Sequence, residues 1–191
     1  MRLVLLAGLL GFVSACSQAP EPMVLPPIEG ALVRGINFNG KGGFEVDGYR
    51  WTSEADSKGN GMMLRDVEAI TTDLVPQPAV DDNTQLLLSG SIAKTGQLNI
   101  DQIMYGAEYE LYFWFMENQK GQRRNMRVEI ENEVVETEMG DLPYRGWARF
   151  GPYPVDLSDG ELNVVITTAD PSHRAEVMGM LIVKPDNSGS L

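Results

Sequence analysis

Apolar and polar side chains alternate through most of the chain, and a period of two is typical of β-strands. The clearest run is Tyr109–Met116, in which both alternating sets of side chains are bulky. We therefore predict a central strand that is covered on both faces. The run Met126–Ile130 alternates apolar with charged residues and predicts a half-exposed strand. Shorter apolar runs predict strands over residues 147–150, 162–167 and 177–183.

Turn signals separate these runs. Asp47-Gly48 lies between two short alternating segments and is a strong hairpin signal, because both turn residues need positive φ. Glu131-Asn132 predicts a second turn, whereas Met62–Ile70 fits either a short helix or a strand. With twenty glycines and eleven prolines, the pattern predicts an all-β domain, an antiparallel β-sandwich over residues 31–185. Residues 186–191 are expected to form a flexible tail.

The N-terminus has the pattern of a secretion signal. Arg2 supplies a positive charge, and Leu3–Val13 is an apolar run too short to span a bilayer. The quartet Val13-Ser14-Ala15-Cys16 resembles the lipobox of bacterial lipoproteins, in which small residues precede the cysteine that takes a diacylglyceryl group. We predict that residues 1–15 are a signal peptide and that Cys16 carries the lipid.

The segment after Cys16 is rich in proline. Four prolines between Ser17 and Ile28 predict an extended, polyproline-like tether over residues 16–30, in which residues 17–28 span roughly 37 Å. More than one acyl chain would hold the protein stably on a membrane. Because Ser17 and not an aspartate follows the cysteine, the resemblance to Gram-negative lipoproteins implies a cell-envelope protein anchored in the outer membrane.

Charge and composition exclude several function classes. The formal net charge of −12 repels nucleic acid, which we exclude as a partner. Cys16 is the single cysteine, so no disulfide can form within the chain. His173 is the single histidine, which leaves too few nitrogen and sulfur ligands for a zinc site. We predict no cofactor and no metal site, although the many carboxylates leave room for a structural calcium ion.

Several motifs resemble malectin-like and related carbohydrate-binding modules. The opening residues 34–40 and 46–51, the strand over residues 109–118 and the strand over residues 124–132 follow the order of those modules, as do residues 159–164 and 179–182. The resemblance covers most of residues 31–184 and implies a galactose-binding-like jelly-roll. It departs from the pattern where Asn39-Gly40 replaces paired glycines and where Asn132 replaces a turn glycine.

Sugars stack on flat amphipathic rings while polar side chains reach their hydroxyl groups. Tyr144 and Trp147 flank Arg145 in a turn-rich stretch, where side chains can escape the core. We predict that these three residues bind carbohydrate, together with the ring of Trp51 and the polar side chains of Asn39 and Glu117. The alternative for Trp147 is that it begins a strand and anchors the core.

Three functions fit this sequence. The first is a membrane-anchored, non-catalytic module that binds a glycan by stacking and hydrogen bonds. The second is a structural or adaptor lipoprotein that binds a protein partner in the envelope. The third is a small glycan-active enzyme, for which Glu117 is the best single carboxylate.

The lipobox generates the first testable prediction. Cys16→Ser is expected to abolish acylation, because no other thiol can accept the lipid. Metabolic labelling with a fatty-acid analogue measures this directly. Label retained on the variant would show that the anchor assignment is wrong.

Overall fold

The computed structural model describes residues 25–186 of the chain. The predicted signal peptide, Cys16, the first part of the predicted tether and residues 187–191 of the predicted tail lie outside the described residues. Among residues 25–186, no helix is long and apolar enough to cross a membrane.

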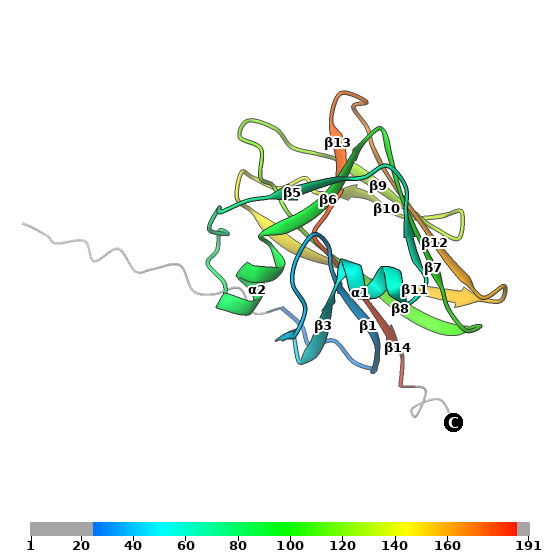
Figure 1. Cartoon of the computed structure of the whole chain (residues 1–191). Coiled ribbons are helices and arrows are strands. Elements are labelled where there is room, and N and C mark those ends of the chain that lie inside the picture. The colour runs from blue at the N-terminus through cyan, green and yellow to red at the C-terminus, as the bar shows by residue number, and fades with distance from the viewer. Residues whose placement is uncertain (1–24, 187–191) are drawn as a thin grey trace, which may run out of the picture.

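The strands form a six-stranded, a five-stranded and a three-stranded sheet (Figure 1). The six-stranded sheet has the order β11 (Trp147–Leu157), β8 (Ala107–Met116), β14 (Gly179–Lys184), β1 (Ala31–Asn37), β3 (Tyr49–Ser53) and β2 (Phe44–Val46). The five-stranded sheet has the order β10 (Glu133–Met139), β9 (Met126–Ile130), β12 (Glu161–Thr168), β7 (Gln97–Ile103) and β4 (Met62–Leu64). The three-stranded sheet has the order β13 (Arg174–Val177), β6 (Gly90–Thr95) and β5 (Glu68–Thr71).

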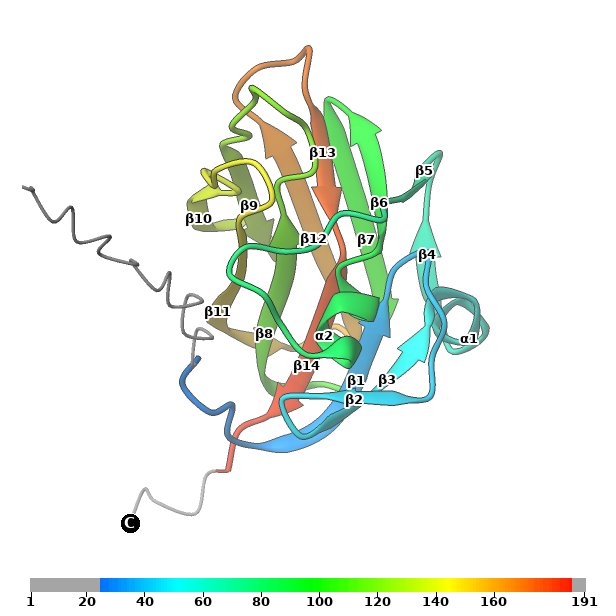
Figure 2. The same ribbon diagram turned by 90° about the vertical axis from the view of Figure 1, so that its left-hand side faces the viewer.

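The predicted all-β sandwich is confirmed. Neighbouring strands pair antiparallel, except that β1 and β3 pair in parallel. In Figure 2, β1 and β14 run side by side although they come from opposite ends of the described chain, and Ala31 pairs with Lys184. Consequently, the two ends of the sandwich domain lie next to each other.

The inner core lies between the six-stranded sheet and the other two sheets. Strand β8 contributes Tyr109, Leu111, Phe113 and Phe115 from one face. The opposing sheets contribute a row of aliphatic and methionine side chains: Met62, Ile92, Leu98, Ile100, Met126, Val128, Ile130, Met139, Leu162, Val164, Ile166, Ala175 and Val177. Burial of this apolar surface is the main source of stability for the sandwich.

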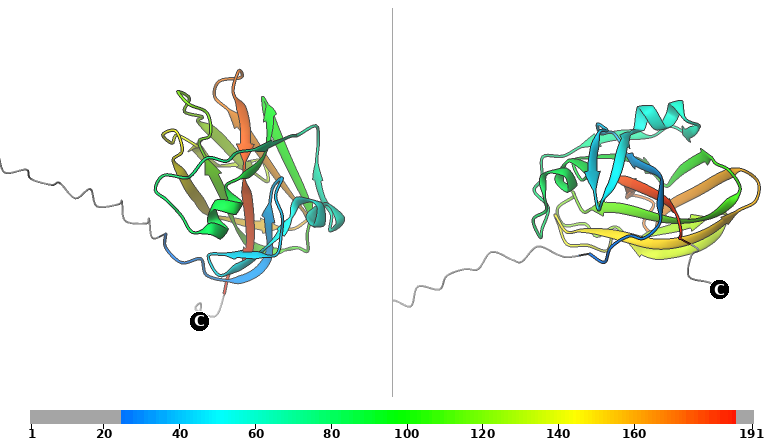
Figure 3. Two further views of the ribbon diagram at one scale, coloured as in Figure 1. Left: turned by 60° about the vertical axis from the view of Figure 1, so that its left-hand side comes forward. Right: turned by 90° about the horizontal axis from the view of Figure 1, so that it is seen from below.

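A second core covers the outer face of the same sheet. Tyr112, Trp114 and Met116 of β8 point outward, and Trp114 meets the ring of Trp51 edge to face with 4.9 Å between centroids. The short helix α2 (Asp82–Leu87) lies against β14, as Figure 3 shows. The predicted strand with bulky side chains on both faces is therefore confirmed.

Residues 25–30, predicted to belong to a free tether, instead pack on this second core. The Tyr49 hydroxyl donates to the backbone oxygens of Ile28, at 3.2 Å, and of Gly30, at 2.9 Å. Arg149 donates to the backbone oxygen of Pro26 and, at 2.7 Å, to the Asp47 carboxylate. Ile28 is buried in the outer core, so residues 25–30 are part of the packed structure.

One charged cluster is fully buried at the far end of β8. Arg124 donates to both carboxylate oxygens of Glu117, at 2.9 and 3.2 Å, and also to Glu176. Ser91 and Asn118 each donate to Glu176 at 2.6 Å. Burial alone would lower the pKa of Arg124, but the charges and hydrogen bonds of the two glutamates outweigh it and raise the pKa. The arginine is therefore held charged between two carboxylates.

Most local predictions are confirmed, and the exceptions have clear causes. Asp47 and Gly48 have positive φ in the predicted hairpin, and so do Glu131 and Asn132 in the second turn. The strand predicted over residues 177–183 is two strands, because the chain crosses from one sheet to another at Met178. Residues 62–70 contain strands β4 and β5 rather than a helix, and two short helices, α1 (Glu54–Gly59) and α2, were missed.

The buried cluster predicts a large stability difference between two arginines. Arg124→Met leaves two carboxylates facing each other without a counter-ion, and we expect it to destabilise the fold by about 3–5 kcal/mol. Arg127→Met is the matched control, because Arg127 pairs with Glu129 at the exposed surface and should cost about 1 kcal/mol or less. Urea unfolding of both variants measures the difference, and equal costs would contradict the role given to the cluster.

Candidate functional site

Two of the sequence-predicted carbohydrate contacts are fully buried. Trp51 is wedged between Trp114 and the α2 side of the outer core. Glu117 is part of the buried cluster with Arg124, where its two carboxylate oxygens are already paired. Neither side chain can touch a ligand from this position, so these two predictions are wrong. The same burial removes Glu117 as a candidate catalytic carboxylate.

Trp147 is also a core residue. Only 6% of its surface is exposed, and its indole nitrogen donates to the backbone oxygen of Pro78 at 2.9 Å. The alternative considered from the sequence, a core anchor at the start of a strand, is therefore the one that the structure supports. The prediction that the Trp147 ring stacks on a sugar is corrected accordingly.

Tyr144 and Arg145 lie in the loop before β11. Tyr144 is exposed at 37%, but Arg145 is occupied with the protein itself. Its Nε donates to the backbone oxygen of Val75 at 2.6 Å, and its backbone oxygen accepts from Gln77 at 2.8 Å. Arg145 therefore connects two loops through its Nε and its backbone oxygen.

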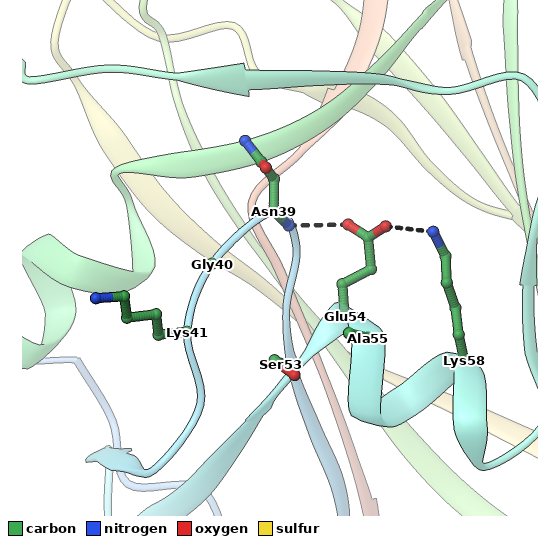
Figure 4. Close-up of a pocket in the computed structure, with 7 residues that line it drawn as sticks. All are labelled: Asn39, Gly40, Lys41, Ser53, Glu54, Ala55 and Lys58. Atoms are coloured by element: carbon green, nitrogen blue, oxygen red, sulfur yellow. Dashed lines mark hydrogen bonds and ion pairs between the residues drawn. The ribbon is translucent and has the colours of Figure 1, made fainter.

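Asn39 lines a pocket of about 440 Å³ near α1 (Figure 4). Its backbone N–H donates to Glu54, at 2.9 Å, and the other oxygen of that carboxylate accepts from Lys58, at 2.6 Å. The Asn39 side chain donates to the backbone oxygen of Ile70 at 2.8 Å. These polar groups satisfy one another, and the lining residues (Asn39, Gly40, Lys41, Ser53, Glu54, Ala55 and Lys58) include no aromatic ring.

The six predicted carbohydrate contacts therefore do not form one site. Three of them are buried in the core region, two lie in the loop before β11, and Asn39 lies beside α1. A different place in the structure combines an exposed ring with polar side chains.

This place is a groove between β1 and the β7–β8 loop, which we call the Arg34 groove. Its first half has a volume of about 390 Å³ and is lined by Val33, Arg34, Asn60, Ile103, Met104, Tyr105 and Tyr109. Its second half has a volume of about 270 Å³ and is lined by Leu32, Val33, Arg34, Gly35, Arg50, Thr52, Ser57 and Asn60. The two halves adjoin, because Val33, Arg34 and Asn60 line both of them.

A β-bulge in β1 creates the groove. Leu32 pairs with Val183 and Arg34 pairs with Ile182, so Val33 is an extra residue between the two pairs. This extra residue shifts the alternation of side chains between the two faces of the sheet by one position. Arg34 therefore lies opposite Ile182 of the inner core, and Leu32 lies opposite Val183 of the outer core. Without the extra residue, the side chains at these two positions would lie on the same face.

Arg34 links the six-stranded sheet to strand β7 of the five-stranded sheet. Its Nη1 donates to the side-chain oxygen of Gln102 and to the backbone oxygen of Asn60, each at 3.0 Å. Gln102 is fully buried, and its side-chain amide donates to the backbone oxygens of Asn60 and Ile103. Burial lowers the pKa of Arg34, yet a guanidinium group stays charged at neutral pH. The groove therefore has a fixed cation at its centre.

Tyr105 is held out of the core at the tip of the β7–β8 loop. Its side chain is 91% exposed, the highest value among the large exposed apolar residues of the described chain. The Tyr109 hydroxyl donates to the backbone oxygen of Tyr105 at 2.8 Å and fixes the loop. Ile103, at 61% exposure, lies beside it. Tyr105 thus presents a flat ring beside Arg34 and the exposed Asn60.

This arrangement has the chemistry of a sugar site. An aromatic ring offers a face on which the C–H patches of a pyranose can stack, and guanidinium and amide groups donate to hydroxyl oxygens. Sequence reasoning missed the groove, because Arg34 was used only to support the family resemblance and Tyr105 was not considered. A bulky aromatic residue directly before a glycine in the turn between two alternating runs was the available signal.

The lone histidine does not build a catalytic triad. Asp170 accepts from the Ser172 hydroxyl at 2.7 Å and lies 3.8 Å from the His173 ring nitrogen, so the carboxylate and not the histidine contacts the serine. This is the hydrogen bonding of a local turn. Among residues 25–186, no three His, Cys, Asp or Glu side chains are gathered to hold a metal ion.

The burial of Trp147 generates a prediction that separates the core role from the binding role. Trp147→Ala should destabilise the fold by about 3–5 kcal/mol, because it leaves a cavity in the outer core. Tyr144→Ala, three residues earlier and exposed, should cost about 1 kcal/mol or less. Thermal or urea unfolding of the two variants checks this, and a small cost for Trp147→Ala would contradict the core assignment.

Several solved structures resemble this fold at low sequence identity. A β-glucuronidase from Bacteroides uniformis, covalently bound to cyclophellitol-6-carboxylate aziridine, matches 80% of this chain with a TM-score of 0.64 and 13% identity. The plant receptor-like kinase FER matches 82% of the chain with a TM-score of 0.61 and 16% identity. The extracellular domain of ANXUR2 from Arabidopsis thaliana matches 84% with a TM-score of 0.61 and 12% identity.

The chain spans only 18%, 43% and 50% of the length of these three structures, respectively. No protein-family model and no curated protein sequence matches the chain. At these identities the structural matches bear on the fold alone, and they agree with the β-sandwich that the malectin-like resemblance implied.

Proposed function

We propose that this protein is a non-catalytic carbohydrate-binding module and that it holds a glycan in the Arg34 groove. One sugar ring stacks on Tyr105, while Arg34 and Asn60 donate hydrogen bonds to its hydroxyl groups. No covalent bond is made or broken in this function.

The exposure of Tyr105 is the observation that carries the proposal. At 91% exposure, both faces of the Tyr105 ring are open to solvent, so a sugar can stack on the ring without any rearrangement of the core. The loop that presents Tyr105 is fixed by the Tyr109 hydroxyl, so little conformational freedom is lost on binding. The concave shape also favours a sugar over a protein partner, which would use a flatter apolar patch.

Two further points support binding rather than hydrolysis. A glycosidase needs a pair of carboxylates beside the scissile bond, and none of the described residues that line the groove is Asp or Glu. The β-glucuronidase match covers only 18% of that enzyme, so a module of this fold can accompany a carbohydrate-active chain.

The cellular setting is part of the same proposal. Lipidation of Cys16 would tether the module to the outer membrane of a Gram-negative bacterium. From there it would bind a cell-wall or environmental glycan.

Two tyrosine-to-alanine variants test the proposed site. Tyr105→Ala should weaken glycan binding by about tenfold or more, equivalent to about 1.4 kcal/mol. Its cost in stability should be about 0.5 kcal/mol or less, because the side chain is exposed. Tyr144→Ala is the matched control: it removes the same side chain from the loop that the sequence alone had favoured. A glycan array of the full-length protein, followed by calorimetry on the best ligand, provides the affinities.

Loss of binding in Tyr144→Ala with unchanged binding in Tyr105→Ala would move the site to the loop before β11. An absence of glycan binding by the unmodified protein across the array would overturn the proposed function.

A further inference from the structure

We infer that the Arg34 groove selects an acidic glycan, one whose sugars carry a carboxylate or a sulfate group. This inference rests on the proposed function and adds the chemical class of the ligand. It follows from the distribution of charge around the groove.

The groove is positive on a protein that is strongly negative. The chain has 27 acidic and 15 basic residues. Along the two halves of the groove, the charged residues lining it are Arg34 and Arg50, with no carboxylate among the described lining residues. Glu45 pairs with Arg50 across β2 and β3, but no ion pair joins their side chains within the described part of the chain. Two guanidinium groups therefore line the groove, and neither is in an ion pair with a carboxylate within the described part of the chain.

Arg34 also keeps unused donors. A guanidinium group has five N–H donors, and the hydrogen bonds to Gln102 and Asn60 both come from Nη1. No other protein acceptor contacts its Nε or Nη2 in the described structure. The remaining edge has the fork geometry that binds carboxylate and sulfate groups with two parallel hydrogen bonds.

The charged residues around the groove also favour one orientation of the ligand. On the far side of Tyr109 lies a separate pocket whose lining includes Glu108, Glu110 and Asp156. These carboxylates repel an anion at the Tyr109 end of the groove, whereas Arg34 and Arg50 attract it toward the other end. We therefore expect the neutral face of one sugar on Tyr105 and an acidic group between the two arginines.

Matched pairs of oligosaccharides test this inference. The probes are short uronic-acid oligosaccharides, each with its carboxyl-reduced counterpart, and sulfated oligosaccharides, each with its desulfated counterpart. Binding is measured by calorimetry on the full-length protein in a non-ionic detergent without a sugar head group. At least one acidic probe should bind about tenfold more tightly than its neutral partner, and added salt should weaken only the acidic probe.

Arginine variants locate the effect. Arg50→Gln should lower the affinity for the acidic probe by about tenfold and should lower the affinity for the neutral partner much less. The Arg50 side chain is exposed and makes no hydrogen bond or ion pair in the described structure, so this variant is expected to fold. Arg34→Lys should cause a similar loss, because lysine keeps the charge but not the fork. Lys120→Gln removes one exposed positive charge beyond the opposite end of β8 and should change neither affinity.

The outcomes distinguish the two proposals. Equal affinity for both members of every pair would overturn the acidic-glycan inference and leave the proposed function standing. A preference for acidic probes that Lys120→Gln weakens as much as Arg50→Gln would also overturn it, because the effect would then be long-range charge. Binding of no oligosaccharide at all would overturn the proposed function itself.

Discussion

The two apolar faces of β8 are the constraint on which the rest of the structure depends. An antiparallel strand at the surface of a sandwich normally has one wet face, but Tyr112, Trp114 and Met116 would expose a large apolar surface if nothing covered them. An outer layer covers this surface. It consists of the N-terminal segment from Leu25, helix α2 and the loop that Arg145 holds by a hydrogen bond. Trp51 and Trp147 are buried in this layer, so neither ring is available to a ligand.

Much of the fold could be predicted from the sequence, because strand periodicity and turn chemistry are local. The alternation over Tyr109–Met116 indicated a strand with apolar side chains on both faces, and the Asp47-Gly48 pair indicated the hairpin. The break at Met178 could not be predicted, because a strand that changes sheets keeps the same apolar pattern on both sides of the change. The helices α1 and α2 have only six residues each, too few for a helical period to emerge from the sequence.

The candidate site was harder to predict than the fold, for a physical reason. Aromatic residues that alternate within strands look alike whether they face a core or a ligand, and the outer core could be seen only after the chain was folded. The groove depends on a one-residue bulge at Val33 and on a loop fixed by the Tyr109 hydroxyl, both of which are tertiary features. Glu117 illustrates the same limit, since it shares its partner Arg124 with Glu176, which lies 59 positions from Glu117 in the chain.

The docking of residues 25–30 has a mechanical consequence. Tyr49 and Arg149 grip the backbone of this segment at Pro26, Ile28 and Gly30 before the chain enters β1. A pulling force applied ahead of Leu25 must therefore break these contacts before it loads the hydrogen bonds of β1, which lies between β14 and β3 in the interior of the sheet. Arg34 lies on β1, so residues 25–30 bear tension on the N-terminus before it reaches the groove.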